Sequence, residues 1–199
     1  MPKVVDHSKR RQDFIDAAYE TILERGLERT TVRAVANKAG YTTGALVHYF
    51  GGKDELIQQA LSQFGSEIRT RMLTAQNTSR GRDALRQLML AALPTNKESA
   101  DRWRVWLAMW YQSETSSEMR AEQRSRYSEW LGRIEMVLQQ SVEDGELPAS
   151  VSTTDEARAL VALIDGTGVQ YLMSGARGSK KKMTALVDRC LTRLYDTPT

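Results

Sequence analysis

The sequence predicts an all-α protein of about nine helices. Its 199 residues include only four prolines and 13 glycines, the residues that most often interrupt helices. Apolar residues recur three and four positions apart through most of the chain, which places them on one face of a helix. A chain of this length has room for one or two domains and a sizeable core. We expect two domains: residues 1–53 with three helices and residues 54–199 with the others.

The first helix is predicted over residues 8–25, where Gly26 ends the pattern. Its apolar positions are Phe14, Ile15, Ala18, Ile22 and Leu23. Residues 1–7 are expected to form a short flexible arm. The basic side chains that follow the arm allow two interpretations, contacts with backbone phosphates or a solvated start of the helix. They are Lys9, Arg10 and Arg11.

The second and third helices are short and are separated by a tight turn. Thr30 or Thr31 can cap the second helix, and Gly40 ends it because glycine takes a left-handed conformation at little steric cost. Thr42 or Thr43 can cap the third. Two helices joined by a three- to four-residue turn with glycine form a helix-turn-helix, whose second helix enters the major groove of DNA.

The third helix has a surface that suits DNA. Leu46 and Phe50 lie four residues apart and should hold it to the core, while Gly44 and Ala45 let the backbone approach the groove. We predict base contacts from Thr43, Ala45, Val47 and His48, phosphate contacts from Thr31, Tyr49 and Lys53, contacts of either kind from Arg33, and further contacts from Thr42 and Gly44.

The positive charge of the chain is concentrated beside this motif. Residues 1–53 hold nine Lys or Arg against six Asp or Glu, and this excess equals the net charge of +3 for the whole chain. A basic region is the electrostatic footprint of a nucleic-acid-binding protein. The charge therefore agrees with the motif, although an excess of three is weak evidence alone.

Residues 30–53 resemble the TetR family of bacterial one-component repressors. The matching positions are Thr31, Ala34, Ala36, Ala39, Gly40, Tyr41, Thr42, Gly44, Leu46, His48, Tyr49, Phe50, Lys53 and Leu56. The resemblance implies a homodimer, formed through the last two helices, that binds an operator in double-stranded DNA. It also implies that the helix after Lys53 transmits the signal of a small-molecule effector.

The second domain is predicted to contain six helices, over residues 54–75, 83–93, 99–113, 117–143, 153–174 and 180–195. Loops are expected at residues 76–82 and 143–152, which contain glycine or proline. Ser152 or Thr153 can cap the fifth of these helices. Both of the last two helices are apolar on more than one side, which a two-fold dimer with a four-helix bundle would cover.

Aromatic side chains gather in the second domain, where all four tryptophans lie between residues 103 and 130. Three of them fall at i, i+3 and i+7 on one helix face, a pattern more typical of a packed core, which we favour for Trp103. So much indole also suits a cage for a flat or cationic ligand. The candidate effector residues are Trp103, Trp106, Trp110, Tyr111, Tyr127, Trp130 and Asp165. Asp165 is either a counter-charge for a cation or a hydrogen-bonded structural residue.

The segments V-W-L-A-M-W-Y at 105–111 and A-L-I-D-G at 162–166 are similar to the choline-responsive BetI branch of the family. This similarity implies choline or a related amine as the effector. The chain has Thr167 and Gly168 where that branch carries a bulky Leu-Trp pair, which predicts a larger pocket. Gly166 and Gly168 either permit close helix contact or open room for a ligand.

Several other functional classes find little support. The two histidines, His7 and His48, cannot be assembled with a nucleophile and an orienting group into a catalytic site. The single cysteine excludes an internal disulfide, and we predict no metal site and no cofactor. No apolar run reaches the length of a membrane span, so we expect a cytoplasmic protein without membrane contact.

The function predicted from the sequence is therefore a ligand-responsive DNA-binding regulator. In the favoured form it is a repressor that leaves a pseudo-palindromic operator when a small molecule binds. The alternatives are a DNA-binding regulator controlled by a protein partner and one with no small-molecule effector.

Overall fold

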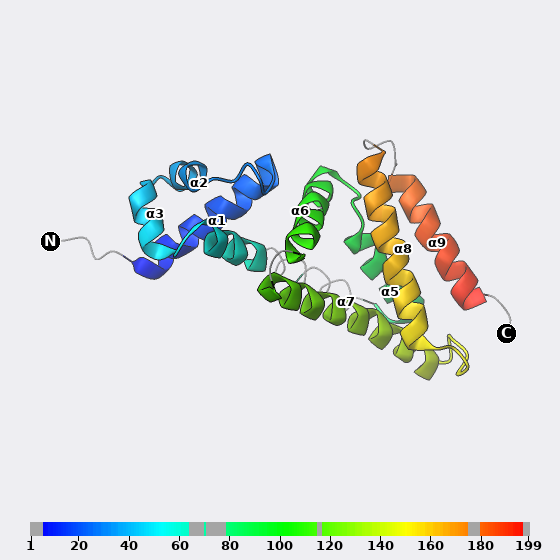
Figure 1. Ribbon diagram of the computed structural model, residues 1–199. Coiled ribbons are helices and arrows are strands. Elements are labelled where there is room, and N and C mark those ends of the chain that lie inside the picture. Colours follow the sequence, from blue (N-terminus) through cyan, green and yellow to red (C-terminus); the bar gives the residue numbers. More distant parts are fainter. Residues whose placement is uncertain (1–5, 64–69, 71–78, 115–116, 175–179, 197–199) are drawn as a thin grey trace. The chain divides into compact units, whose positions relative to one another are not determined.

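The computed structural model describes residues 6–63, 70, 79–114, 117–174 and 180–196, and the regular structure in these ranges is helical (Figure 1). The helices are α1 (His7–Arg25), α2 (Val32–Ala39), α3 (Thr43–Tyr49), α5 (Gly81–Ala92), α6 (Lys97–Ser113), α7 (Ser117–Glu143), α8 (Thr153–Met173) and α9 (Lys180–Asp196). Residues 53–63 are helical too. The all-α prediction is confirmed.

The chain divides into two compact units. The first unit comprises residues 1–68 and 104–119, and the second comprises residues 69–103 and 120–199. The division falls inside α6, after Trp103. The residues of 54–63 and the C-terminal half of α6 thus pack with the helix-turn-helix. The functional boundary after residue 53 stays a prediction.

The core of the first unit gathers the apolar faces of α1, α2, α3 and residues 53–63. Leu46 and Phe50, predicted to anchor the third helix, are 0% and 1% exposed. Val105 and Met109 of α6 belong to the same cluster of buried side chains. Residues 64–75 of the helix predicted over 54–75 lie outside the described residues, except Thr70, so the buried positions of this helix are confirmed only as far as Leu61.

Helix α1 begins one residue earlier than its apolar pattern suggests. The backbone N–H of Lys9 donates to Asp6 Oδ1 at 3.0 Å, so Asp6 caps the helix and His7 is its first residue. The predicted flexible arm was therefore too long, because its last two residues belong to the cap and first turn of α1. Residues 1–5 lie outside the described ranges.

Two helices of the second domain also begin two residues before their predicted starts. Helix α5 begins at Gly81, which takes a φ of 56°, and the Glu146 carboxylate accepts from the N–H of Arg82 at 3.0 Å. Helix α6 begins at Lys97 because Asn96 Oδ1 accepts from the N–H of Ser99 at 2.8 Å. Both partners lie beyond the apolar pattern on which the predictions were based.

In the second unit, α7 and α8 are joined by the loop over residues 144–152 and contact each other through side chains at two levels. Thr154 donates to Glu135 near the loop, and Tyr127 donates to Asp165 farther along both helices. Ser152 caps α8 by accepting from the N–H of Asp155. No helix within the described ranges is both long and apolar enough to cross a membrane.

Candidate DNA-binding face and effector site

Both helices of the helix-turn-helix begin at a threonine cap, and a glycine ends the first of them. Thr31 Oγ1 accepts from the N–H of Ala34 at 3.1 Å, and Thr42 Oγ1 accepts from the N–H of Ala45 at 3.2 Å. Gly40 ends α2 with φ 75° and ψ 26°, in the left-handed region. Of the alternatives in the sequence, Thr31 and Thr42 are therefore the caps. Neighbouring Thr30 is buried, and its hydroxyl donates to the carbonyl of Gly26.

The outer face of α3 is exposed at four of the predicted positions: Thr43, Gly44, Val47 and His48. Val47 is an aliphatic side chain with 58% of its surface exposed. An exposed valine on this helix fits contact with the methyl group of thymine. Ala45 is only partly exposed and packs against the core, which leaves it less surface for a base contact. Arg33 and Lys53 are exposed.

Tyr49 connects α3 to the start of α1. Its hydroxyl lies 2.8 Å from Nδ1 of His7, and its ring lies 5.8 Å from that of Phe14. The turn before α3 has a similar connection, since the hydroxyl of Tyr41 donates to Asp13 at 2.9 Å. The first turns of α1 therefore help to orient the helix on which most of the DNA contacts are predicted.

The basic residues of α1 differ in their surroundings. Arg11 donates to Glu55 at 3.2 Å and lies over the ring of Phe50 at 4.8 Å, so it holds α1 against residues 50–55. Arg10 lies over the ring of Tyr41 at 4.9 Å. Lys9 is exposed. Arg11 is thus placed as a structural residue, which neither interpretation from the sequence included.

The predicted effector residues fall into two groups, one in each unit. Trp106, Trp110 and Tyr111 belong to the first unit. The rings of Trp106 and Trp110 lie 6.1 Å apart, and Trp106 packs against the core that supports the helix-turn-helix. Tyr111 is 75% exposed. The other four, Trp103, Tyr127, Trp130 and Asp165, belong to the second unit.

Asp165 and Tyr127 form a polar pair between α8 and α7. The hydroxyl of Tyr127 donates to Asp165 Oδ2 at 3.0 Å. Burial raises the pKa of the Asp165 carboxyl, and the hydrogen bond from Tyr127 opposes that shift. Burial, together with the nearby Asp165 carboxylate, raises the pKa of Tyr127 to about 12. Tyr127 is therefore a neutral donor near neutral pH. Asp165 is therefore hydrogen-bonded, as one of its two interpretations predicted. This bond does not exclude the other interpretation, in which its carboxylate is the counter-charge for a cation.

Trp103 packs one turn farther along the same face of α8. It is 8% exposed, and its indole N–H donates to the carbonyl of Ala92 at 2.7 Å. Its ring fills the space that a Cβ at Gly168 would occupy. Asp165 and Gly168 are three residues apart and share a helix face. Gly168 thus lets the Trp103 ring pack closely against α8 and does not open space for a ligand. Because the indole N–H of Trp103 is already bonded to Ala92, Trp103 can offer a ligand only its ring.

We expect Gly168→Ala to destabilise the protein by about 1–3 kcal/mol, the usual cost of overpacking a close contact. For a chain of this size the melting temperature should fall by about 2–4 °C for each kcal/mol. Gly132→Ala on α7 is the matched control, because a Cβ there meets nothing within 4 Å. Differential scanning calorimetry would measure both. A Gly168→Ala protein as stable as the control would show that the Trp103 ring can move aside without cost.

The same face of α7 carries a buried polar side chain that was not singled out from the sequence, Gln123. It is 8% exposed on α7, four residues before Tyr127 and seven before Trp130, so the three side chains share one face. A signal was available, since a glutamine interrupts an otherwise apolar and aromatic stripe. A single glutamine in a long helix does not show from the sequence whether its amide is buried or exposed.

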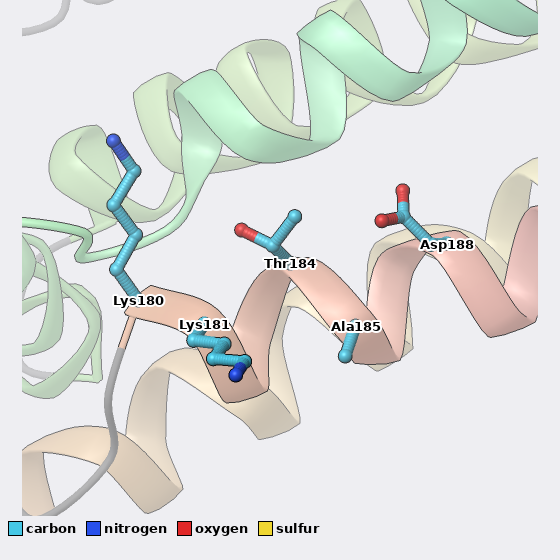
Figure 2. A pocket seen from close by; sticks show the side chains of 5 residues that line it. All are labelled: Lys180, Lys181, Thr184, Ala185 and Asp188. Atoms are coloured by element: carbon cyan, nitrogen blue, oxygen red, sulfur yellow. The ribbon is translucent and has the colours of Figure 1, made fainter.

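A surface groove of the second unit lies elsewhere, along the first turns of α9. It is lined by Lys180, Lys181, Thr184, Ala185 and Asp188. Figure 2 shows Lys180, Thr184 and Asp188 on one side of the helix and Lys181 and Ala185 on another. Asp188 is paired with Arg86 of α5 at 2.6 Å. The groove is open and charged, with no aromatic side chain, and does not fit an aromatic cage.

Two family models match the chain. The model for bacterial regulatory proteins of the tetR family matches residues 14–60, and the model for the C-terminal part of BetI-type transcriptional repressors matches residues 81–196. The chain belongs to the TetR family. This TetR-family protein is a DNA-binding transcriptional regulator and not an enzyme, as the sequence predicted, and its effector domain is of the BetI type.

Relatives of the TetR-family chain match it over most of its length. The regulator PksA of Bacillus subtilis is 28% identical and covers 94% of this chain and 90% of its own. The regulator BetI of Burkholderia cenocepacia is 31% identical, covering 88% of each chain. Among solved structures, a transcriptional regulator from Saccharomonospora viridis in complex with choline matches with a TM-score of 0.83 and 24% identity, covering 92% and 95% of the two chains.

Proposed function

We propose that the protein is a repressor that leaves its operator when a small ammonium compound, choline or a related amine, binds in the second unit. The observation that carries this proposal is the half-buried Asp165 carboxylate, held by Tyr127 and one turn from the ring of Trp103. A carboxylate and an aromatic face are the two groups that attract a desolvated cation. The choline bound to the Saccharomonospora viridis relative supports the same class of effector.

The proposed DNA-bound form is a homodimer in which α8 and α9 pack against their copies. In support, the exposed side of α8 carries a stripe of small or apolar residues at i, i+3, i+7 and i+14, and the last of them is 75% exposed. These residues are Ala159, Ala162, Gly166 and Met173. Two-fold symmetry would place the two α3 helices about 34–36 Å apart, which requires a pseudo-palindromic operator. Such a repressor would act on the chromosome, in the cytoplasm.

Within this proposal, all ten residues named from the sequence remain DNA contacts, with the exposed Thr43, Val47 and His48 as the base-reading set. Ala45 would contribute chiefly by letting the helix approach. The effector would favour a dimer whose α3 helices no longer match the operator. To change the DNA-competent fraction from 99% to 1%, it must bind the released form about 5.5 kcal/mol more tightly.

Lys53→Ala should weaken binding to all DNA sequences alike, because a phosphate contact carries no base information. The slope of log affinity against log salt concentration should fall by about one for each Lys53 that contacts a phosphate. Fluorescence anisotropy at several salt concentrations would measure this slope. Lys97→Ala removes an exposed lysine of the second unit and should leave the slope as it is. An unaltered slope in Lys53→Ala would exclude Lys53 from the phosphate contacts.

The experiment that tests the proposed function combines two titrations of the intact protein. Tryptophan fluorescence is followed on addition of choline, betaine aldehyde and bulkier quaternary amines, and release of operator DNA is followed with the same compounds. A saturable fluorescence change with release of DNA at the same concentrations is the expected result. DNA binding that no ammonium compound weakens would contradict the proposed effector class and favour a regulator without such a ligand.

A further inference from the structure

Gln123 is a buried polar side chain without a hydrogen-bond partner. Only 8% of the residue is exposed, and neither Nε2 nor Oε1 of its amide meets a partner among the residues that the structure describes. Buried amides are nearly always paired. An amide buried without a partner has given up the hydrogen bonds that it made to water in the unfolded chain and has gained none in return, which costs free energy. An orphaned buried amide one turn from the Tyr127–Asp165 pair is therefore a candidate contact for a ligand.

The position of Gln123 places it beside the proposed effector site. It lies one turn, about 6 Å along the axis, before Tyr127 on α7. Tyr127 in turn reaches α8, where its hydroxyl donates to Asp165 Oδ2 at 3.0 Å. Gln123 therefore lies on the same face of α7 as the residue that holds Asp165, one turn away. A small ligand bound at Asp165 and extending by one turn along α7 would reach the Gln123 amide.

The Asp165 carboxylate and the Gln123 amide would bind different chemical groups at the two ends of such a ligand. Asp165 is a carboxylate that suits a positive charge, whereas a glutamine amide can donate through its NH₂ and accept through its oxygen. Trp103 offers only its ring, since its indole N–H is bonded to Ala92. An alkylammonium ion alone would leave the amide unpaired. An ammonium compound with a hydroxyl or carbonyl oxygen would pair with it.

We propose that Gln123 recognises the oxygen of the effector and thereby selects oxygen-bearing ammonium compounds over purely alkyl ones. This inference rests on the proposed function, because it assigns the ammonium end of the ligand to Asp165. It adds a second contact point and a rule for selectivity. Gln123 acts as a specificity residue in the effector site, where its otherwise unpaired amide meets the oxygen of the effector.

The test compares choline with n-propyltrimethylammonium, in which a methyl group replaces the hydroxyl. Isothermal titration calorimetry gives the ratio of the two affinities for the natural protein, Gln123→Leu and Gln139→Leu. Gln139 is an exposed glutamine of the same helix and serves as the matched control. We expect a preference for choline of about tenfold in the natural protein and the control. In Gln123→Leu the ratio should fall to about one.

A second measurement needs no ligand. Because Gln123→Leu removes two unpaired polar atoms from the interior, the melting temperature of the free protein should rise, by about 2–4 °C. A fall would show that Gln123 has a structural partner and would overturn the inference. Equal affinities for the two ligands in the natural protein, or a preference for choline that survives in Gln123→Leu, would also overturn it while leaving the proposed function intact. Failure of both ligands to bind would defeat the proposed function and this inference together.

Discussion

Val47→Glu is expected to abolish specific operator binding while the protein stays folded. Val47 is 58% exposed on the outer face of α3, where its methyl groups can meet the major groove. A glutamate there would place a negative charge and its water shell against base edges and phosphates. One mismatched base contact costs about 1–3 kcal/mol, and a symmetric dimer makes the contact twice. The operator affinity should fall by about 30-fold to 10⁴-fold.

The matched control for this change is Gln139→Glu, which alters the net charge equally at an exposed position of the second unit. Fluorescence anisotropy with a labelled operator would compare the two proteins, and thermal melts would check their folding. We expect nearly natural affinity for Gln139→Glu and natural melting temperatures for both. A Val47→Glu protein that bound its operator as well as the control would remove Val47 from the DNA interface.

Asp165→Asn should produce a repressor that binds its operator but no longer responds to ammonium compounds. Removing one partner of a buried charge pair costs about 2–5 kcal/mol, which corresponds to a loss of affinity of about 30-fold or more. The asparagine keeps an oxygen that can accept from Tyr127, so the packing of α7 on α8 should persist. Calorimetric titration with choline and operator-release assays would measure the effect. Natural affinity for choline in Asp165→Asn would place the cation elsewhere.

The pH dependence of the natural protein offers an independent check on the same carboxyl group. Because burial raises the pKa of Asp165, its carboxyl becomes neutral at a higher pH than an exposed aspartate does. Ammonium affinity should therefore fall as pH is lowered through this raised pKa, and Asp165→Asn should lack the fall. The stability of the free protein changes with pH in the opposite direction. Because a raised pKa means that the folded form binds the proton more tightly than the unfolded form does, protonation of Asp165 stabilises the fold. This stabilisation is lost as pH rises through the raised pKa.

The helix-turn-helix could be predicted closely because its signals are local. Thr31, Gly40 and Thr42 act on backbone groups only a few residues away, so their pattern defines the caps and the turn. The starts of α5 and α6 were each missed by two residues. Glu146 supports the first from 64 positions away, and the cap of the second lies outside its apolar stripe.

The effector residues were harder to predict because helical spacing says which side chains share a face, not what that face meets. Trp103 and Trp106 lie three residues apart on α6, yet one packs on Gly168 and the other against the core of the first unit. From the sequence, Gly168 could either allow close packing or open space for a ligand. The ring that decides for close packing belongs to Trp103, 65 positions away in the chain. Gln123 became visible as a candidate only when its amide was found buried and unpaired.

The contribution of α6 to the first unit has a consequence for how such regulators diversify. Val105 and Met109 complete the core beneath the helix-turn-helix, although residues 69–103 of the other unit separate them from residue 68. A fragment ending at residue 53 or 68 would expose that core and should aggregate or unfold. For the same reason, a single crossover that exchanges N-terminal segments between relatives would mismatch the packing. New pairings of operator and inducer should therefore arise more readily when substitutions in the two segments accumulate together.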